Sequence, residues 1–303
     1  MAKRSAIALL ITVFFIIAIS VSLGISLRQV KEASQEVENE VFMLQSALVL
    51  EDVLNILKNS KELDAVAQEN SVEGFFLFLS EVGFIPFESE GIKVSIEISS
   101  ARAKFNINTL SDANATQPKK TQAMSAYLSN FAINDEYVGI LLDNMSGMKE
   151  DNSYNSAIFN ENPTLFREYI VSQKHLDEIN KYYMQSTHKN AITKVDFEKL
   201  LYFSKPKNYF VDVNYATKEV WRLMLGCDEL RAEELSLGGG LYTKEEDLLL
   251  SETETELLKR FETSFYEPYL DVKVGMSKNN AAAFVRFEYD MKTKKGSNFV
   301  YEI

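Results

Sequence analysis

The first 60 residues carry two successive apolar patterns, both compatible with a helix. Residues 6–27 contain no charged side chain, and about 20 apolar residues in a helix span the roughly 30 Å hydrocarbon core of a bilayer. In residues 28–58, which contain no Pro or Gly, the apolar positions recur at helical spacing. The recurring positions are Val30, Val37, Val41, Leu44 and Leu48. The pattern predicts one continuous helix of about 50 residues, roughly 75 Å long, that starts in lipid and becomes amphipathic.

Three interpretations of this segment remain open at this point. It is a cleaved secretory signal, a plain signal anchor, or a pilin-type leader that is cut before the helix rather than after it. A signal peptide would end in a helix breaker and a loop, so the unbroken pattern favours the other two. The basic Lys3 and Arg4 precede the apolar run, and acidic residues follow Lys31. This distribution favours a cytoplasmic N-terminus and a body on the outer side of the membrane.

Beyond residue 60 the pattern predicts a helix at 71–85, ended by Pro86. Alternating apolar and polar residues predict a strand at 92–98, and a second short strand fits 103–107. Strand patterns return only at 268–303. The intervening residues mostly predict helices, at 121–131, 134–146, 163–184, 194–203, 216–225, 229–236 and 243–264.

These elements predict an α+β fold in which strands from both ends of the chain share one sheet. The fold consists of a long N-terminal helix packed on a small antiparallel sheet, with a large all-helical insertion. Thr217 is the expected N-cap of one inserted helix and Gly226 its expected end. The run 238–240 is three glycines and predicts a flexible turn, because no Lys and Ser/Thr follow it as a phosphate loop requires.

Composition narrows the classes of function. With 46% apolar residues, 12 Gly and 5 Pro, the chain is expected to be folded rather than disordered. The net charge of -12 argues against non-specific binding to nucleic acid. Cys227 is the single cysteine, which excludes an intrachain disulfide and a cysteine zinc site. His175 and His188 are expected at the surface. Because no nucleophile-elbow, zinc or nucleotide motif occurs, we expect a protein that is not an enzyme.

Three stretches of the chain resemble the K-type minor pseudopilins of the bacterial type II secretion system, which belong to the pilin-like class. Residues 3–13 are similar to the family's basic leader, small residue and Ala-Leu-Leu-rich helix. Residues 103–110, Ala-Lys-Phe-Asn-Ile-Asn-Thr-Leu, resemble its Phe-Asn-Leu-Asn segment. Residues 211–217, Val-Asp-Val-Asn-Tyr-Ala-Thr, resemble its Val-Asn-Val-Asn-Thr-Ala segment.

The resemblance implies a pilin-like fold and a set of segment boundaries. Residues 1–6 would be a leader that a prepilin peptidase removes between Ala6 and Ile7, with methylation of the product. Residues 7–27 would be the transmembrane half of the helix. Residues 28–110 and 265–303 would form a discontinuous α/β domain, and residues 111–264 the helical insertion.

The resemblance also implies a place and partners. The protein would lie in the bacterial inner membrane as a single-pass protein, in contact with the lipid bilayer, with its body in the periplasm. Its partners would be the I-type and J-type minor pseudopilins, the major pseudopilin and the inner-membrane secretion platform. Most pilins carry a glutamate five residues into the mature helix, where this chain has Ile11. A subunit without that carboxylate suits the end of a filament, and the resemblance implies the same place, the pseudopilus tip.

The family has an Asp-rich stretch before its acidic calcium ligands, and residues 143–152 resemble that stretch only in part. Asp143, Glu150 and Asp151 remain as possible oxygen ligands for calcium, but EF-hand spacing is absent. A solvated acidic loop is the alternative. Asn106, Asn108 and Asn214 are expected to fasten the insertion to the sheet, because Asn side chains bond backbone groups in turns.

Two other functions remain compatible with the sequence. One is a minor pilin of a type IV pilus or DNA-uptake system. The other is a signal-anchored periplasmic sensor or binding protein, in which the long helix would form a dimeric coiled coil.

Overall fold

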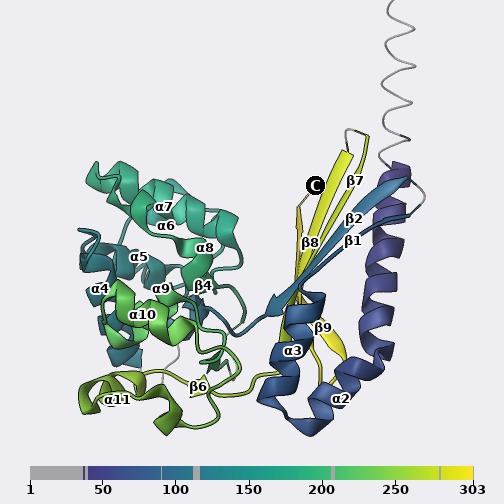
Figure 1. Ribbon diagram of the computed structural model, residues 1–303. Helices are drawn as coiled ribbons and strands as arrows, with labels where there is room; N and C mark the ends of the chain where they lie inside the picture. The colour runs from purple at the N-terminus through teal and green to yellow at the C-terminus, as the bar shows by residue number, and fades with distance from the viewer. Residues whose placement is uncertain are drawn as a thin grey trace, which may run out of the picture.

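The computed structural model describes residues 37, 40–89, 91–111, 117–205, 209–279 and 281–302 (Figure 1). The predicted leader and apolar span lie outside these residues. Within the described part of the chain, no helix is both long and apolar enough to cross a membrane. The described structure contains a helix-and-sheet head and a lobe rich in short helices, on the side of the sheet away from the N-terminal helix (Figure 1).

The head begins with the N-terminal helix, which is continuous over residues 40–59. Ser60 then caps α2 (Lys61–Glu69), and Ser71 caps α3 (Val72–Val82). The sequence prediction of a helix up to residue 85 was wrong. The helix ends before Gly83, and residues 84–86 belong to strand β1 (Phe84–Ser89). Pro86 is tolerated there because β1 is an edge strand, where one N–H can be absent without breaking the sheet.

One antiparallel sheet unites strands from both ends of the chain. Its order is β1-β2-β7-β8-β9, so the prediction that distant strands share a sheet is confirmed. β2 (Ile92–Ser100) pairs with β7 (Tyr269–Lys278), which places Ile96 opposite Val274. β8 (Ala281–Asp290) and β9 (Lys295–Glu302) complete it. The apolar side chains of alternate positions face the N-terminal helix and form the core of the head with Phe75 of α3.

The predicted strand at 103–107 does not join this sheet. Only β3 (Phe105–Asn106) is extended, and it pairs in parallel with β4 (Leu201–Tyr202) of the lobe. A 3-10 turn at Ile107–Ser111 follows β3. A pair of residues is too short to show a period of two, so sequence alone could not decide its partner.

The lobe is built of short helices around a second core that contains Trp221, Tyr137 and Tyr183. The predicted helices at 163–184 and 243–264 were too long. The first helix starts only at Gln173, and the second is broken into a 3-10 turn, a helix and a short strand. Thr217 and Gly226 do cap α9 as predicted. The lobe's elements are α4 (Gln117–Ser129), α5 (Asp135–Asp143), α6 (Ile158–Glu161), α7 (Gln173–Thr187), a 3-10 turn (Ala191–Lys194), α8 (Phe197–Leu200), β4, β5 (Val211–Asp212), α9 (Lys218–Leu225), α10 (Glu229–Ser236), a 3-10 turn (Glu245–Leu248), α11 (Glu252–Leu258) and β6 (Thr263–Ser264).

The segment at 211–217 bonds to both chain segments that connect the lobe with the head, one at Arg102 and one at Ser264. The backbone N–H of Asp212 donates to the carbonyl of Arg102 at 2.9 Å, and that of Val213 donates to Ser264 at 3.0 Å. The Asp212 carboxylate also accepts from the N–H of Glu267 at 2.9 Å. Residues 211–217, one of the three stretches that carry the sequence resemblance, therefore lie at the junction between the lobe and the head. We call this junction the neck.

The glycine run at 238–240 is a packed contact rather than a free turn. A Cβ on Gly240 would lie 2.7 Å from Cγ of Phe76 in α3, and Gly240 has a φ of +77°. Glycine is required there because a side chain would push the lobe away from α3.

The predicted α+β architecture is confirmed: a helix packed on an antiparallel sheet, with an insertion that is mainly helical.

Candidate interaction surface on the N-terminal helix

The N-terminal helix has two apolar sides. At about 100° per residue, Phe42, Leu50, Val53 and Leu57 face the sheet, where each is at most 8% exposed. The opposite side carries Val37, Val41, Leu44 and Leu48, which are 45–69% exposed. We call these four residues the outer stripe.

The outer stripe consists of apolar positions that recur at helical spacing in residues 28–58. The sheet does not cover these positions. The sequence argument treated the helix as having a single apolar face. The second face could have been found from Phe42 and Leu50, which lie about half a turn away from the stripe. Four exposed aliphatic residues on one side of a helix form an apolar seam, as in helices that pack against another helix.

The stripe stops at Leu48. Further along the same side of the helix, the exposed residues are Glu51, Asp52, Asn55, Lys58 and Asn59. A partner helix is therefore expected to follow only the first part of the described helix.

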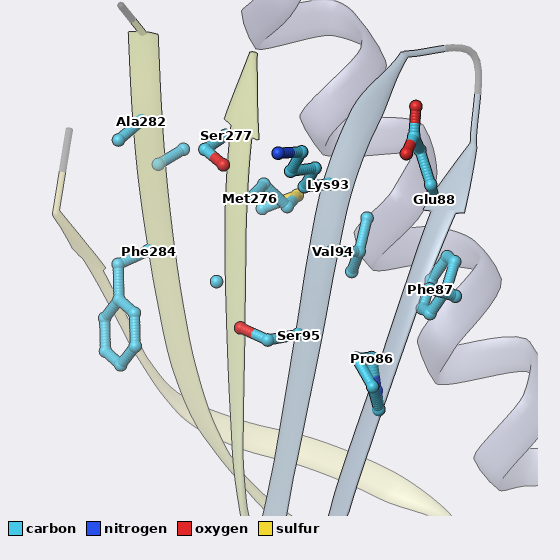
Figure 2. Close-up of a pocket in the computed structure, with 12 residues that line it drawn as sticks. Pro86, Phe87, Glu88, Lys93, Val94, Ser95, Met276, Ser277, Ala282 and Phe284 are labelled. Atoms are coloured by element: carbon cyan, nitrogen blue, oxygen red, sulfur yellow. The ribbon is translucent and has the colours of Figure 1, made fainter. Parts of the chain in front are cut away.

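The far face of the sheet, turned away from the helix, has a hollow beside Phe284 (Figure 2). Pro86, Ser95, Gly275 and Phe284 form one row across four strands, and the hollow measures about 760 Å³. It exists because Gly275 has no side chain and Ser95 has a small one. The lining combines apolar groups with Glu88 and Lys93, which are cross-strand neighbours.

The three candidate calcium ligands are not brought together. Asp143 is fully buried, and its oxygens accept four hydrogen bonds of 2.7–2.9 Å from the backbone and side chains of Asn155 and Ser156. Glu150 and Asp151 are exposed. Among the described residues, no group of three or more His, Cys, Asp or Glu could hold a metal ion. The Asp143 carboxylate is instead the fastening point of the loop at 155–156.

The three asparagines fasten segments of the lobe to one another, and the expected bonds to the five-stranded sheet are not formed. Asn106 donates to the carbonyl and hydroxyl of Ser204, and Asn108 donates to Ile170 and Ser204. Asn214 donates to the carbonyls of Tyr242 and Phe265. The acceptors are mostly backbone carbonyls of segments outside helices and strands. Such carbonyls have no hydrogen-bond partner within a helix or sheet, so the asparagine amides satisfy them.

A buried ion pair, which sequence reasoning missed, joins the neck to the sheet. Arg102 donates to both oxygens of Glu288, at 2.7 and 2.9 Å. Its guanidinium lies between the rings of Tyr209 and Tyr269, 4.4 and 3.9 Å from their centroids. Burial alone would lower the pKa of Arg102, but its hydrogen bonds to Glu288 raise the pKa. The arrangement holds one end of the lobe against the sheet.

The two histidines differ from each other. His188 is exposed, as predicted, but His175 is 7% exposed, and the surface prediction for it was wrong. Its Nδ1 accepts from the N–H of Val171 at 3.4 Å, and its Nε2 lies 3.4 Å from Oδ1 of Asn144. Burial lowers the pKa of His175, so a neutral ring suits this position. The predicted processing residues Ala6 and Ile7 lie outside the described residues.

Comparison with known proteins places this arrangement in one class of fold. No protein-family model and no curated protein matches the sequence. The crystal structure of the GspK-GspI-GspJ complex from the type 2 secretion system of enterotoxigenic Escherichia coli contains a similar chain. The likeness covers 90% of this chain and 97% of that chain, with a TM-score of 0.51 and 13% identity. At this identity the likeness concerns the fold, which both chains share.

Proposed function

We propose that this protein is a K-type minor pseudopilin of a bacterial type II secretion system. It helps to start and to cap the periplasmic pseudopilus, which moves folded proteins through the outer membrane, and it has no catalytic role. Its partners are the I-type and J-type minor pseudopilins and the major pseudopilin. The inner membrane holds its N-terminal segment together with the secretion platform, and a prepilin peptidase processes it between Ala6 and Ile7.

The outer stripe is the observation that carries this proposal. A subunit of a helical filament must use its long helix twice, once to support its own head and once to contact neighbours. Here one side of the helix is buried under the sheet and the other presents Val37, Val41, Leu44 and Leu48 to solvent. Burying a fully exposed Leu or Val side chain contributes about 1.5–3 kcal/mol. These four are already partly covered, so covering the rest favours a helix contact by a part of that amount each, against the entropic cost of association.

Two further observations support a place at the end of the filament. On its own side of the helix the outer stripe stops at Leu48 and is followed by exposed polar residues up to Asn59, with Ile56 as an exposed apolar residue off that side, so the stripe offers a neighbour only the first part of the described helix. The lobe extends to the side of the sheet opposite the helix (Figure 1). Such bulk is accommodated more easily at a tip than between stacked subunits.

The test replaces stripe residues in the full chain. Leu44→Lys with Leu48→Lys should abolish filament assembly and secretion, because two charges would be buried against a neighbouring helix. Asn55→Lys with Asn59→Lys is the matched control: it places the same charges on the same side of the same helix, beyond the stripe. Normal secretion and assembly in the stripe variant, at normal protein level, would refute the proposal.

Mapping the mature N-terminus by mass spectrometry separates the alternatives. A chain that starts at Ile7 supports pilin processing. A chain that starts at Met1 supports a signal anchor, for which the stripe would instead mediate a homodimeric coiled coil. Immuno-electron microscopy adds the position: labels along the shaft, rather than once per filament end, would contradict the tip.

A further inference from the structure

A second apolar feature lies beside the outer stripe, between the N-terminal helix and the last strand. Phe299 and Tyr301 of β9 remain 37% and 59% exposed. Between helix and strand is a groove of about 240 Å³, which we call the side groove. Its lining is mainly apolar, with Glu51 as its one charged residue, and includes Met43, Ser46, Ala47, Leu54 and Tyr301.

The side groove contains one polar group that the fold leaves unused. Ser46 is 6% exposed, and its hydroxyl has no hydrogen-bond partner among the residues that the structure describes. Buried hydroxyl groups are nearly always hydrogen-bonded. An unbonded hydroxyl that lines an apolar groove therefore indicates that something else supplies its partner.

The side groove and the outer stripe form one surface. Met43 and Ala47 line the groove, and each directly precedes a stripe residue, Leu44 and Leu48. Successive residues lie about 100° apart around a helix, so the two features are neighbours. A helix packed on the stripe can therefore place one side chain into the groove.

The size and polarity of the groove limit what that side chain can be. A volume of about 240 Å³ leaves room for one aromatic ring, and the lining is mainly apolar. Glu51 also lines the groove, but it is exposed, so a charged side chain that reached as far as Ser46 would lose its hydration against apolar groups. A phenylalanine would fill the space but leave the Ser46 hydroxyl unbonded. Tyrosine and tryptophan combine an apolar ring with a polar atom that needs a partner when buried.

We propose that the side groove receives a tyrosine or tryptophan from the helix of a neighbouring pilin-like subunit, and that its polar atom bonds the Ser46 hydroxyl. This inference rests on the proposed function, since it names a contact within the same filament. It assigns Ser46 and the rim residue Ala47 to partner recognition.

The partner is identified by cross-linking in the full chain, in cells with an intact secretion system. A photoreactive benzoylphenylalanine replaces Met43, at the rim of the groove, and in a control chain replaces Asn59. The expected adduct of the Met43 chain joins the helix of a different pilin-like subunit, within a turn of a Tyr or Trp. No adduct, or an adduct on a strand or lobe, overturns the inference.

Two variants then test the contact itself. Ser46→Ala should leave the melting temperature unchanged or higher, yet weaken binding to the cross-linked partner by about three- to ten-fold, the value of one hydrogen bond. Ala47→Trp should block the groove and abolish the adduct. Unchanged binding in both variants overturns the groove assignment. If Leu48→Lys abolishes binding in that case, the proposed function stands without the groove; if Leu48→Lys is also without effect, both fail.

Discussion

Replacing Arg102 by methionine is the sharpest test of how the lobe is attached. Methionine keeps most of the length and the apolar stem, and removes the charge and both hydrogen bonds to Glu288. The Arg102 and Glu288 side chains are 5% and 8% exposed. Solvent therefore cannot replace the lost partner, and the Glu288 carboxylate is left buried without a counter-ion.

The structure sets the expected magnitude. Stranding one member of a buried ion pair costs about 3–5 kcal/mol. The guanidinium also contacts the faces of Tyr209 and Tyr269, and each such contact contributes about 1 kcal/mol. We expect Arg102→Met to lower the free energy of unfolding by about 5–7 kcal/mol. The double variant Arg102→Met with Glu288→Leu should recover most of this loss, because an apolar pair replaces both charges.

The assay uses a reporter that the chain provides. Trp221 is the single tryptophan, fully buried in the lobe, so its fluorescence follows lobe unfolding in urea. Circular dichroism follows the whole chain. A loss below about 1 kcal/mol, or a double variant as unstable as the single one, would refute the view that this ion pair holds the neck.

Three other predictions concern the lobe and the neck. Asp143→Asn should lower the free energy of unfolding by about 2–3 kcal/mol, because the new NH2 group faces N–H donors whose hydrogen bonds the carboxylate accepted. Calcium or EDTA should not move the melting temperature of the parent chain, and a rise with calcium would show a metal site. Gly240→Ala should lower the free energy of unfolding by about 1–3 kcal/mol and increase proteolysis at the neck. The control is Gly226→Ala, which has a φ of +62° but nothing within 4 Å of the new Cβ and therefore measures backbone strain alone. Equal losses of stability in the two variants would contradict the contact with Phe76. Burial raises the pKa of Asp212 from 3.8 to about 7, against the lowering effect of the backbone donors of Asn214 and Glu267. The folded state then holds a proton that the unfolded state releases, so stability should fall as pH rises from about 4 to 7, by up to about 4 kcal/mol at about 1.4 kcal/mol per pH unit, and level off above. In Asp212→Asn this fall should disappear from pH-dependent urea titrations, and an unchanged slope would contradict the assignment.

The sequence predicted those parts of the fold that repeat a period. β2 and β7 alternate apolar and polar residues over several positions, and this identified them as strands of one half-buried sheet. The caps of α9 followed from the chemistry of Thr217 and Gly226. Helix ends were predicted less well, because residues 84–86 are as apolar as the helix before them.

The neck could not be predicted, because its contacts have no period. β3 to β6 are two residues each, and Arg102 meets Glu288 across 186 positions of sequence. The asparagines were correctly expected to bond backbone groups, but only the structure shows that their acceptors lie in the lobe. For the candidate surface, the sequence predicted the apolar rows of the helix, and the structure was needed to show which row the sheet leaves uncovered.

The two sides of the N-terminal helix explain how a single element can serve both folding and assembly. Phe42, Leu50, Val53 and Leu57 belong to the core of the head, so changes there should act first on stability. The head does not cover the outer stripe, so its four residues contribute little to the stability of the head. A partner can therefore determine which side chains suit these positions. Within the described residues, the sheet-facing row continues to Leu57, whereas the outer row ends at Leu48.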